Sequence, residues 1–273
     1  MKIHNLMNRT FINRPIHKVE WPVPNVLAFT TTRLHPQNHT ISQTSEIKPY
    51  SEFNLGEHVG DNLEQVESNR KHLLNNLPPH SKIQWLEQIH GNKVVTLDSH
   101  SLIPLVADAS ITQQKNISLA VMTADCLPIL LTAADGSEIA AIHGGWKPLA
   151  KNIIANTVNC MRTPNKNIIA WLGPCIGKAA FEVGEEVKFA FEKKSENFSS
   201  AFSVSPKNQV SISNKHKVKY LANLAMIAKM QLETLGVNQL HHLNHCTYSD
   251  EQQYFSYRRD NVTGRMASII CRI

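Results

Sequence analysis

Continuous apolar runs of strand length dominate the middle of the chain. The segment ISLAVMTA (117–124) has the length and composition of a buried strand. Two apolar runs within 128–145 are joined by Asp135-Gly136, a dipeptide typical of tight hairpin turns. Residues 83–97 alternate around a Gly-Asn pair, which predicts a strand or hairpin. Further strands are predicted at 167–174, 241–248 and 265–273.

Helical spacing appears in four other segments. In 61–79, Asp61 is the expected N-cap, Glu64 completes a capping box, and Pro78-Pro79 ends the helix. The apolar positions of that helix are Leu63, Val66, Leu73, Leu74 and Leu77. The other predicted helices cover 147–163, 184–194 and 217–236.

The order of these elements mixes hairpins with strand–helix units. This order favours an α+β fold with mixed β-sheets packed between helices over a purely parallel doubly wound sheet. No linker or internal repeat divides the chain, so we expect one domain over 1–273. The least structured stretch, roughly 34–52, is polar and predicts a long loop.

Composition narrows the class of protein. Hydrophobic residues make up 42% and charged residues 18% of the chain, as in ordinary globular proteins. The net charge of +6 suits anionic substrates, but the basic residues are scattered, which argues against nucleic acid as a partner. No apolar run is long enough for a membrane span, and no leader is recognisable. Five widely spaced cysteines suit reduced thiols, so we expect a cytoplasmic protein.

One cysteine and one histidine stand at the two outer ends of the predicted hairpin. Cys126 follows the 117–124 strand, and His143 ends the return strand just before two glycines. Because a hairpin brings its outer ends together, we expect these side chains to converge at one sheet edge. His90 also stands at a predicted strand end and is followed by glycine.

Two imidazoles and one thiolate are good ligands for Zn²⁺, and catalytic zinc sites commonly use three protein ligands with one open position. Spacing alone leaves two other interpretations open. The three residues could be ordinary core and surface groups, or Cys126 could be a nucleophile activated by a neighbouring histidine.

Six ordered blocks resemble one known family: 53–61, 87–95, 123–131, 140–146, 172–187 and 255–270. It is the family of zinc-dependent purine nucleoside phosphorylases that also act as adenosine deaminases. Its members were earlier described as multicopper polyphenol oxidases (laccases), and some as peptidoglycan editing factors. The likeness runs from about residue 29 to the C-terminus. It implies a mixed α/β fold shared with certain bacterial toxin catalytic domains.

The resemblance also implies a chemistry and a set of site residues. Zinc would be held by His90, Cys126 and His143, which would also be the catalytic residues. The substrates would be adenosine, inosine and 5'-methylthioadenosine, with phosphate as co-substrate, and adenosine would also be deaminated. The substrate-binding candidates are Arg33, Asn54, Gln88, Lys147 and Arg258. Trp146 and Phe255 are candidates for stacking on a purine, and Glu87 and Asp125 lie beside ligand positions.

The chain departs from the family pattern in three places. Lys147 stands where the family usually has an arginine after the second histidine. Lysine keeps the positive charge but lacks the planar guanidinium fork. Cys175 stands where the family usually has alanine. An early glycine-rich stretch after Arg33 is replaced by the polar loop.

Two other functions remain as alternatives. A copper-dependent polyphenol oxidase would use the same donor types, with Met122 nearby, but the chain lacks the His-x-His pairs of multicopper oxidases. A metal-free cysteine hydrolase acting on peptidoglycan precursors would use Cys126 as nucleophile. We expect a monomer or a homodimer.

Overall fold

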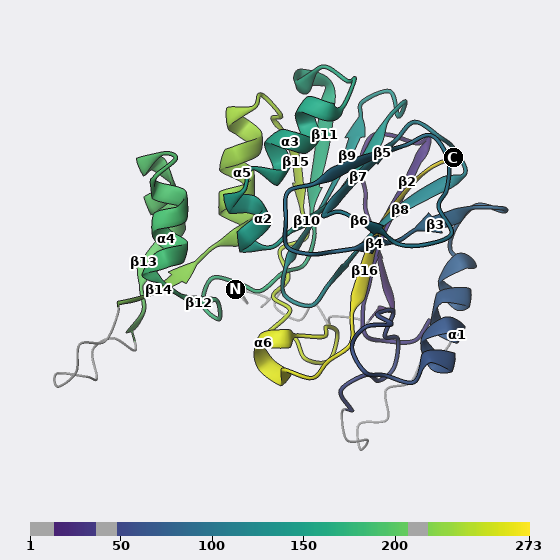
Figure 1. Cartoon of the computed structure of the whole chain (residues 1–273), viewed down its shortest axis with the longest axis horizontal. Helices are drawn as coiled ribbons and strands as arrows, with labels where there is room; N and C mark the ends of the chain where they lie inside the picture. The colour runs from purple at the N-terminus through teal and green to yellow at the C-terminus, as the bar shows by residue number, and fades with distance from the viewer. Residues whose placement is uncertain (1–13, 37–47, 207–217) are drawn as a thin grey trace, which may run out of the picture.

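Two stacked β-sheets form the centre of the computed structural model, which describes residues 14–36, 48–206 and 218–273 (Figure 1). In order across it, the five-stranded sheet contains β1 (Ile16–Lys18), β2 (Val26–Thr31), β16 (Met266–Arg272), β8 (Ile117–Thr123) and β3 (Lys82–Gln84). The six-stranded sheet contains β15 (Gln239–His242), β11 (Ile168–Leu172), β9 (Leu127–Ala133), β10 (Ile139–Gly144), β7 (Ala109–Thr112) and β5 (Val94–Leu97). Both sheets combine parallel and antiparallel pairs.

Two smaller sheets and several helices complete the described fold. The smaller sheets are β12 (Glu182–Gly184), β14 (Lys219–Ala222) and β13 (Phe202–Val204), and β4 (Leu86–Glu87) with β6 (Leu105–Val106). The α-helices are α1 (Leu63–Leu74), α2 (Trp146–Ala150), α3 (Ile153–Cys160), α4 (Glu185–Glu192), α5 (Leu224–Thr234) and α6 (Tyr257–Asp260). Two 3-10 helices cover Asn165–Asn167 and Glu196–Ala201.

Alternation along the strands sorts most buried apolar side chains into three large clusters, beside a small fourth one around Met266 of β16. Leu130 of β9 faces the five-stranded sheet and packs in one cluster with Val121 of β8. Its neighbour Ile129 faces the other way and packs with Val158 of α3 in a second cluster. A third cluster joins Leu73 of α1 to the outer face of the five-stranded sheet. The result is four layers: helices, sheet, sheet and helix.

The hairpin predicted around Asp135-Gly136 is confirmed. β9 and β10 pair antiparallel, with Ile142 opposite Ile129 and His143 opposite Pro128. Gly136 has a φ of +71°, a backbone conformation that glycine adopts without steric cost. The strands predicted at 117–124, 167–174 and 265–273 also form, as β8, β11 and β16. The segment 241–248 forms only the end of β15.

Three of the predicted elements differ in detail. The first helix is capped by Asn62, whose side chain accepts from the Gln65 amide, rather than by Asp61. The segment 147–163 forms two helices, because Asn152 adopts a left-handed conformation with φ of +65° between them. The segment 217–236 begins with the strand β14 before α5 starts.

Of the two interpretations of 83–97, a strand or a hairpin, strands form as β3, β4 and β5, but the hairpin does not. β3 pairs in parallel with β8 in the five-stranded sheet, whereas β5 pairs in parallel with β7 in the six-stranded sheet. The chain therefore crosses from one sheet to the other in this segment. His90 lies in the connecting loop between β4 and β5.

The fold class is the predicted α+β class with mixed sheets packed between helices. Residues 37–47 of the predicted polar loop lie outside the described part of the chain. None of the helices in the described ranges has the length and apolar character needed to cross a bilayer.

Candidate functional site

A cavity of about 1220 Å³ opens where the loop after β4, the loop before β9 and the end of β10 meet. His90, Cys126 and His143, the three predicted metal ligands, all line it. His90 is exposed, Cys126 is partly exposed and His143 is buried. The group therefore lies at the wall of the cavity, with one side open to a ligand.

The β9–β10 hairpin brings Cys126 and His143 together. His143 lies opposite Pro128, so the end of β10 returns beside Cys126 at the start of β9. His90 adopts a φ of +56°, which turns its loop back toward them. A Cβ added at Gly145 would lie 3.0 Å from the Cys126 Sγ and 3.2 Å from the His90 ring, so glycine leaves the space that the three side chains share.

The ligand atoms of these residues lie within 4.8 Å of one another. The Cys126 Sγ is 3.8 Å from the His90 Nε2, and the two imidazole centroids are 4.7 Å apart. These separations are compatible with three corners of a tetrahedron around one metal ion. No other group of three or more His, Cys, Asp or Glu side chains is so assembled within the described ranges.

A buried aspartate that sequence reasoning missed connects the two histidines. The Asp108 Oδ1 accepts from the His143 Nδ1 at 2.8 Å and from the His90 backbone amide at 3.0 Å. Its Oδ2 accepts from the Gly91 amide at 2.6 Å. Because Nδ1 of His143 is bonded to the carboxylate, Nε2 is the nitrogen left to face Cys126, as a metal ligand requires.

Cys126 and His143 form a charged pair. Burial opposes ionisation of the Cys126 thiol, but the charge of His143 and hydrogen bonds from both histidines outweigh it and lower the thiol pKa to about 6. Burial likewise lowers the pKa of His143, but the Cys126 thiolate and the Asp108 carboxylate raise it to about 9. The pair therefore favours the thiolate of Cys126, the form that binds metals, and a bound metal ion would replace the extra proton of His143.

The two acidic candidates have different surroundings. The buried Asp125 carboxylate accepts from the Thr247 hydroxyl at 2.6 Å, the Ser256 hydroxyl at 3.0 Å and the Arg258 amide at 2.6 Å. Asp125 thus fixes the Cys126 loop to the start of α6. The exposed Glu87 lines the cavity, and its carboxylate has no hydrogen bond or ion pair with any described residue.

Three of the five predicted substrate-binding residues line the cavity: Gln88, Lys147 and Arg258. The Gln88 amide is engaged with the Met122 backbone, donating to its carbonyl and accepting from its N–H. The Arg258 Nη1 donates to the Ala180 and Glu182 carbonyls, which leaves its other donors open. Lys147 is exposed, with its ammonium 5.8 Å from the centroid of the Trp146 ring.

The structure does not bring the other two substrate candidates to the cavity wall. The Arg33 guanidinium is buried and donates to the Lys48, Ser51 and Glu251 carbonyls, so it ties loops together. Asn54 is fully buried, and its side chain bonds to Gly56, to Asp61 and to the Arg265 amide. Both side chains stabilise the backbone near the cavity without facing it.

Several lining residues were not predicted from the sequence. His58, Arg70 and Arg265 add cationic or titratable groups, and Trp85, Phe181 and Tyr257 add aromatic surface. Of the two predicted stacking candidates, Trp146 lines the cavity, whereas Phe255 is fully buried and packs under the Arg33 guanidinium. The wall therefore combines aromatic faces with positive charge.

Cys175, a second of the three departures from the family pattern, lies in the core. Burial raises the pKa of its thiol far above the usual value, so the side chain stays neutral. We therefore expect no chemical role for this thiol.

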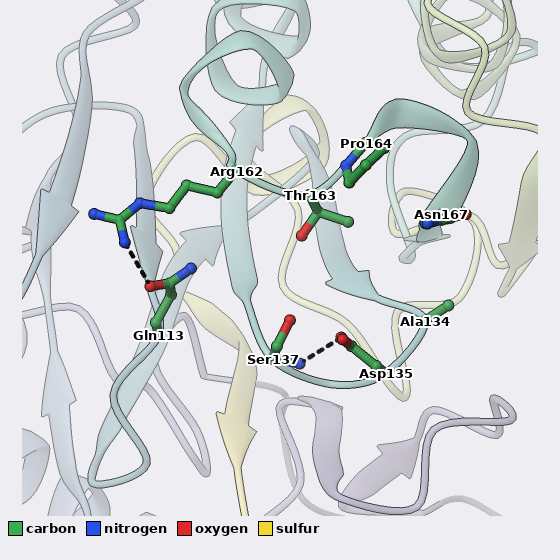
Figure 2. Close-up of a pocket in the computed structure, with 8 residues that line it drawn as sticks. All are labelled: Gln113, Ala134, Asp135, Ser137, Arg162, Thr163, Pro164 and Asn167. Carbon is green, nitrogen blue, oxygen red and sulfur yellow. Dashed lines mark hydrogen bonds between the residues drawn. The ribbon is translucent and has the colours of Figure 1, made fainter.

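A second, separate hollow of about 560 Å³ lies at the turn of the β9–β10 hairpin (Figure 2). Arg162 lies on its rim and donates to the Gln113 Oε1 at 3.2 Å (Figure 2). The Asp135 carboxylate is engaged with the Ser137 amide of the same turn. None of the three metal-ligand candidates lines this hollow.

The protein thus has a four-layer α+β core with a large cavity at one edge. A His–Cys–His group that could bind a metal ion lies on the wall of this cavity. The chain belongs to the family described as multi-copper polyphenol oxidoreductase laccase, which matches residues 37–273. The resemblance found in the sequence is thereby confirmed.

Individual relatives carry a different name from the family. The chain is 42% identical over 254 residues to the purine nucleoside phosphorylase YfiH of Escherichia coli, covering 92% of this chain and 96% of that protein. It is 41% identical over 251 residues to a purine nucleoside phosphorylase of Haemophilus influenzae, again covering 92% and 96%.

Solved structures support the fold. A Neisseria meningitidis protein superposes with a TM-score of 0.82 at 37% identity, covering 95% of this chain and 99% of that one. YlmD from Geobacillus stearothermophilus superposes with a TM-score of 0.74 at 25% identity, covering 92% and 93%.

Proposed function

We propose that this chain is a zinc-dependent purine nucleoside phosphorylase that cleaves adenosine, inosine and 5'-methylthioadenosine with phosphate and also deaminates adenosine. The observation that carries the proposal is the His90–Cys126–His143 group at the wall of a cavity large enough for a nucleoside and phosphate. The names of the relatives give the reaction class.

The donor set fits zinc. One thiolate and two imidazoles, with a carboxylate behind one histidine and an open side, match the ligand types of catalytic zinc sites. Copper also accepts these donors. A multicopper enzyme, however, needs additional histidine clusters, and the described residues assemble only this group. When bound, zinc supplies a Lewis acid beside the substrate.

For phosphorolysis, the chain must hold an anion next to a ribose that gains positive charge as the base departs. Lys147 and Arg258 line the cavity and supply positive charge for the anion. Trp85, Trp146 and Tyr257 offer aromatic faces for the purine. The nucleoside would thus be held between the aromatic wall and the cations, with its reacting atoms toward the metal ligands.

For deamination, water adds at C6 of adenine and ammonia leaves, so one group must accept and return a proton. Glu87 is the acidic side chain best suited to this role, because it lines the cavity and its carboxylate is free of described partners. Asp125 is less suited, since its carboxylate already accepts three hydrogen bonds.

Metal quantification with a product assay tests the proposal. Wild-type protein should contain about one zinc per chain, release adenine from adenosine only with phosphate, and form inosine without it. Cys126→Ala should lose the zinc and, because the Lewis acid goes with it, about 100-fold or more of both activities. As a control, Cys160→Ala at an exposed cysteine should keep both.

Other results would point elsewhere. Full zinc content and activity in Cys126→Ala would refute the zinc site. Phenol turnover on copper loading would instead support the oxidase. Activity that survives chelation but not thiol alkylation would support a cysteine hydrolase.

A further inference from the structure

Arg265 is a partly buried cation at the cavity wall with unused hydrogen-bond donors. Its Nη1 donates to the Thr263 and Gly264 carbonyls, at 2.9 and 3.0 Å. Its Nε and Nη2 have no hydrogen-bond partner among the described residues, and no described carboxylate lies within ion-pair distance. Partial burial of a guanidinium that has no ion-paired carboxylate is costly, so an anionic ligand would stabilise it.

The backbone around Arg265 is fixed by the segment 54–56. The Asn54 Oδ1 accepts from the Arg265 amide at 2.8 Å, and the Leu55 amide donates to the Arg265 carbonyl at 3.1 Å. The stem of Arg265 packs on Gly56, where an added Cβ would lie 2.8 Å from the Arg265 Cγ. The position of the guanidinium is therefore set before any ligand arrives, which lowers the entropic cost of binding.

The other cations that line the cavity are either paired with a carboxylate or exposed to solvent. Arg70 is paired with Glu57 and stacks on Trp85, with its Cζ 4.2 Å from the ring centroid. Lys147 and Arg258 are exposed, so water solvates their charge. Arg265 alone in this set combines partial burial, the absence of a described acidic partner and a fixed stem.

His58 is exposed and lines the same cavity as Arg265. Partial burial and the positive charges of Arg265 and Arg70 lower the pKa of its imidazole, so the ring is neutral at neutral pH and can both donate and accept. Arg265 lines the same cavity as Asp125 and Cys126, and the negative charges of these two side chains partly oppose the lowering of the Arg265 pKa by burial.

We propose that Arg265 forms the subsite for inorganic phosphate in this cavity, whose wall His58 shares. The proposal rests on the phosphorolytic activity proposed above and names residues for it that neither the sequence nor the relatives assign. The planar fork of the guanidinium matches two phosphate oxygens, which a lysine ammonium cannot do equally well.

The transfer that this subsite serves is balanced. A phosphate oxygen forms a bond to C1' of the ribose while the C1'–N9 bond breaks, and its electron pair leaves with the purine. The proton of hydrogen phosphate ends on the departing base, so the products are the free purine and ribose 1-phosphate. Arg265 would hold two of the three oxygens that do not attack.

Steady-state kinetics with Arg265→Gln test the subsite. The KM for phosphate should rise roughly 10- to 100-fold, as expected for losing hydrogen bonds to a charged group, with little change in the KM for inosine. Deamination of adenosine, which consumes no phosphate, should fall much less than phosphorolysis. The matched control is Arg162→Gln on the second hollow, which should leave both KM values unchanged.

A second variant acts on the same guanidinium without removing it. Gly56→Ala pushes against the Arg265 stem and should raise the KM for phosphate in the same direction by a smaller factor. Calorimetric titration with inorganic phosphate should likewise show weaker binding to both variants. If Arg265→Gln does not fold, Arg265→Lys and Gly56→Ala carry the test.

The outcomes separate the two proposals. Wild-type KM for phosphate in both the Arg265 variant and Gly56→Ala, with phosphorolysis intact, overturns the subsite and leaves the proposed function standing. Absence of phosphorolysis in the wild-type protein overturns both. Loss of deamination together with phosphorolysis in Arg265→Gln would mean a general structural role and would also overturn the subsite.

Discussion

At the scale of single residues, one buried carboxylate organises the metal-ligand group. Asp108 contacts the His143 ring, the His90 amide and the Gly91 amide, so it sets the orientation of one ligand and the backbone of another. Hydrogen bonds from His143 and Gly91 keep the pKa of its carboxyl low despite burial, so it stays charged. Removing the charge of Asp108 should weaken metal binding, although none of the three metal ligands is replaced.

Asp108→Asn is therefore expected to lower zinc affinity by about 10- to 100-fold, since carboxylates behind a ligating histidine contribute about this much. Competition with a chromogenic chelator measures the affinity. Asp98→Asn at an exposed position is the control and should behave as wild type. Unchanged affinity in the Asp108 variant would show that the carboxylate serves folding alone.

Individual site residues were predictable to different degrees. Cys126 and His143 stand at the ends of one local hairpin, so their meeting follows from nearby sequence. Asp108 lies 35 residues from His143, and no local pattern marks its contact. Asn54 lies in a family-like block, but its side chain faces the Arg265 backbone, a contact across 211 residues.

At the scale of elements, the β9–β10 hairpin matters most, because it brings Cys126 and His143 together. Its turn depends on Gly136, whose φ is +71°. A Cβ there would also lie 2.3 Å from the Asn25 Oδ1, so the turn is packed against the segment before β2.

Gly136→Ala should destabilise the protein by about 1–3 kcal/mol, because it adds backbone strain and a steric clash. Gly236→Ala is the matched control, since Gly236 also has positive φ, at +82°, but its Cβ would meet open space. Thermal unfolding should show the larger drop in Tm for Gly136→Ala. Equal drops in the two variants would contradict the packing of the turn on Asn25.

The elements that sequence reasoning placed wrongly share a cause. Alternation within 83–97 is real, but β3 and β5 pair with strands far along the chain, in different sheets. The break between α2 and α3 depends on one left-handed residue, Asn152, inside an otherwise amphipathic pattern. Local patterns reveal that a strand or helix forms, whereas tertiary contacts decide its partner and its ends.

At the scale of the whole molecule, the metal-ligand group exists only when the two sheets are assembled. His90 lies in the loop that connects the two sheets. Cys126 immediately precedes β9, and His143 lies in β10, both strands of the six-stranded sheet. The unfolded chain does not hold these side chains together, so metal binding must favour the folded state.

Removing the metal with a chelator should therefore lower the Tm of the wild-type protein, by several degrees if zinc exceeds its Kd about 100-fold. His90→Ala, which lacks one ligand, should show a much smaller shift between chelator and zinc. Differential scanning calorimetry makes the comparison. An equal response of both proteins would place the stabilising metal elsewhere.

The aromatic wall of the cavity has one more consequence. Two of the four tryptophans of the chain, Trp85 and Trp146, line the cavity, while Trp171 is buried between the sheets. Trp85 lies against the Arg70 guanidinium, and Trp146 lies beside Lys147. The molecule thus contains its own optical reporter, because a purine stacked in the cavity would change the emission of these two indoles and leave that of Trp171 constant.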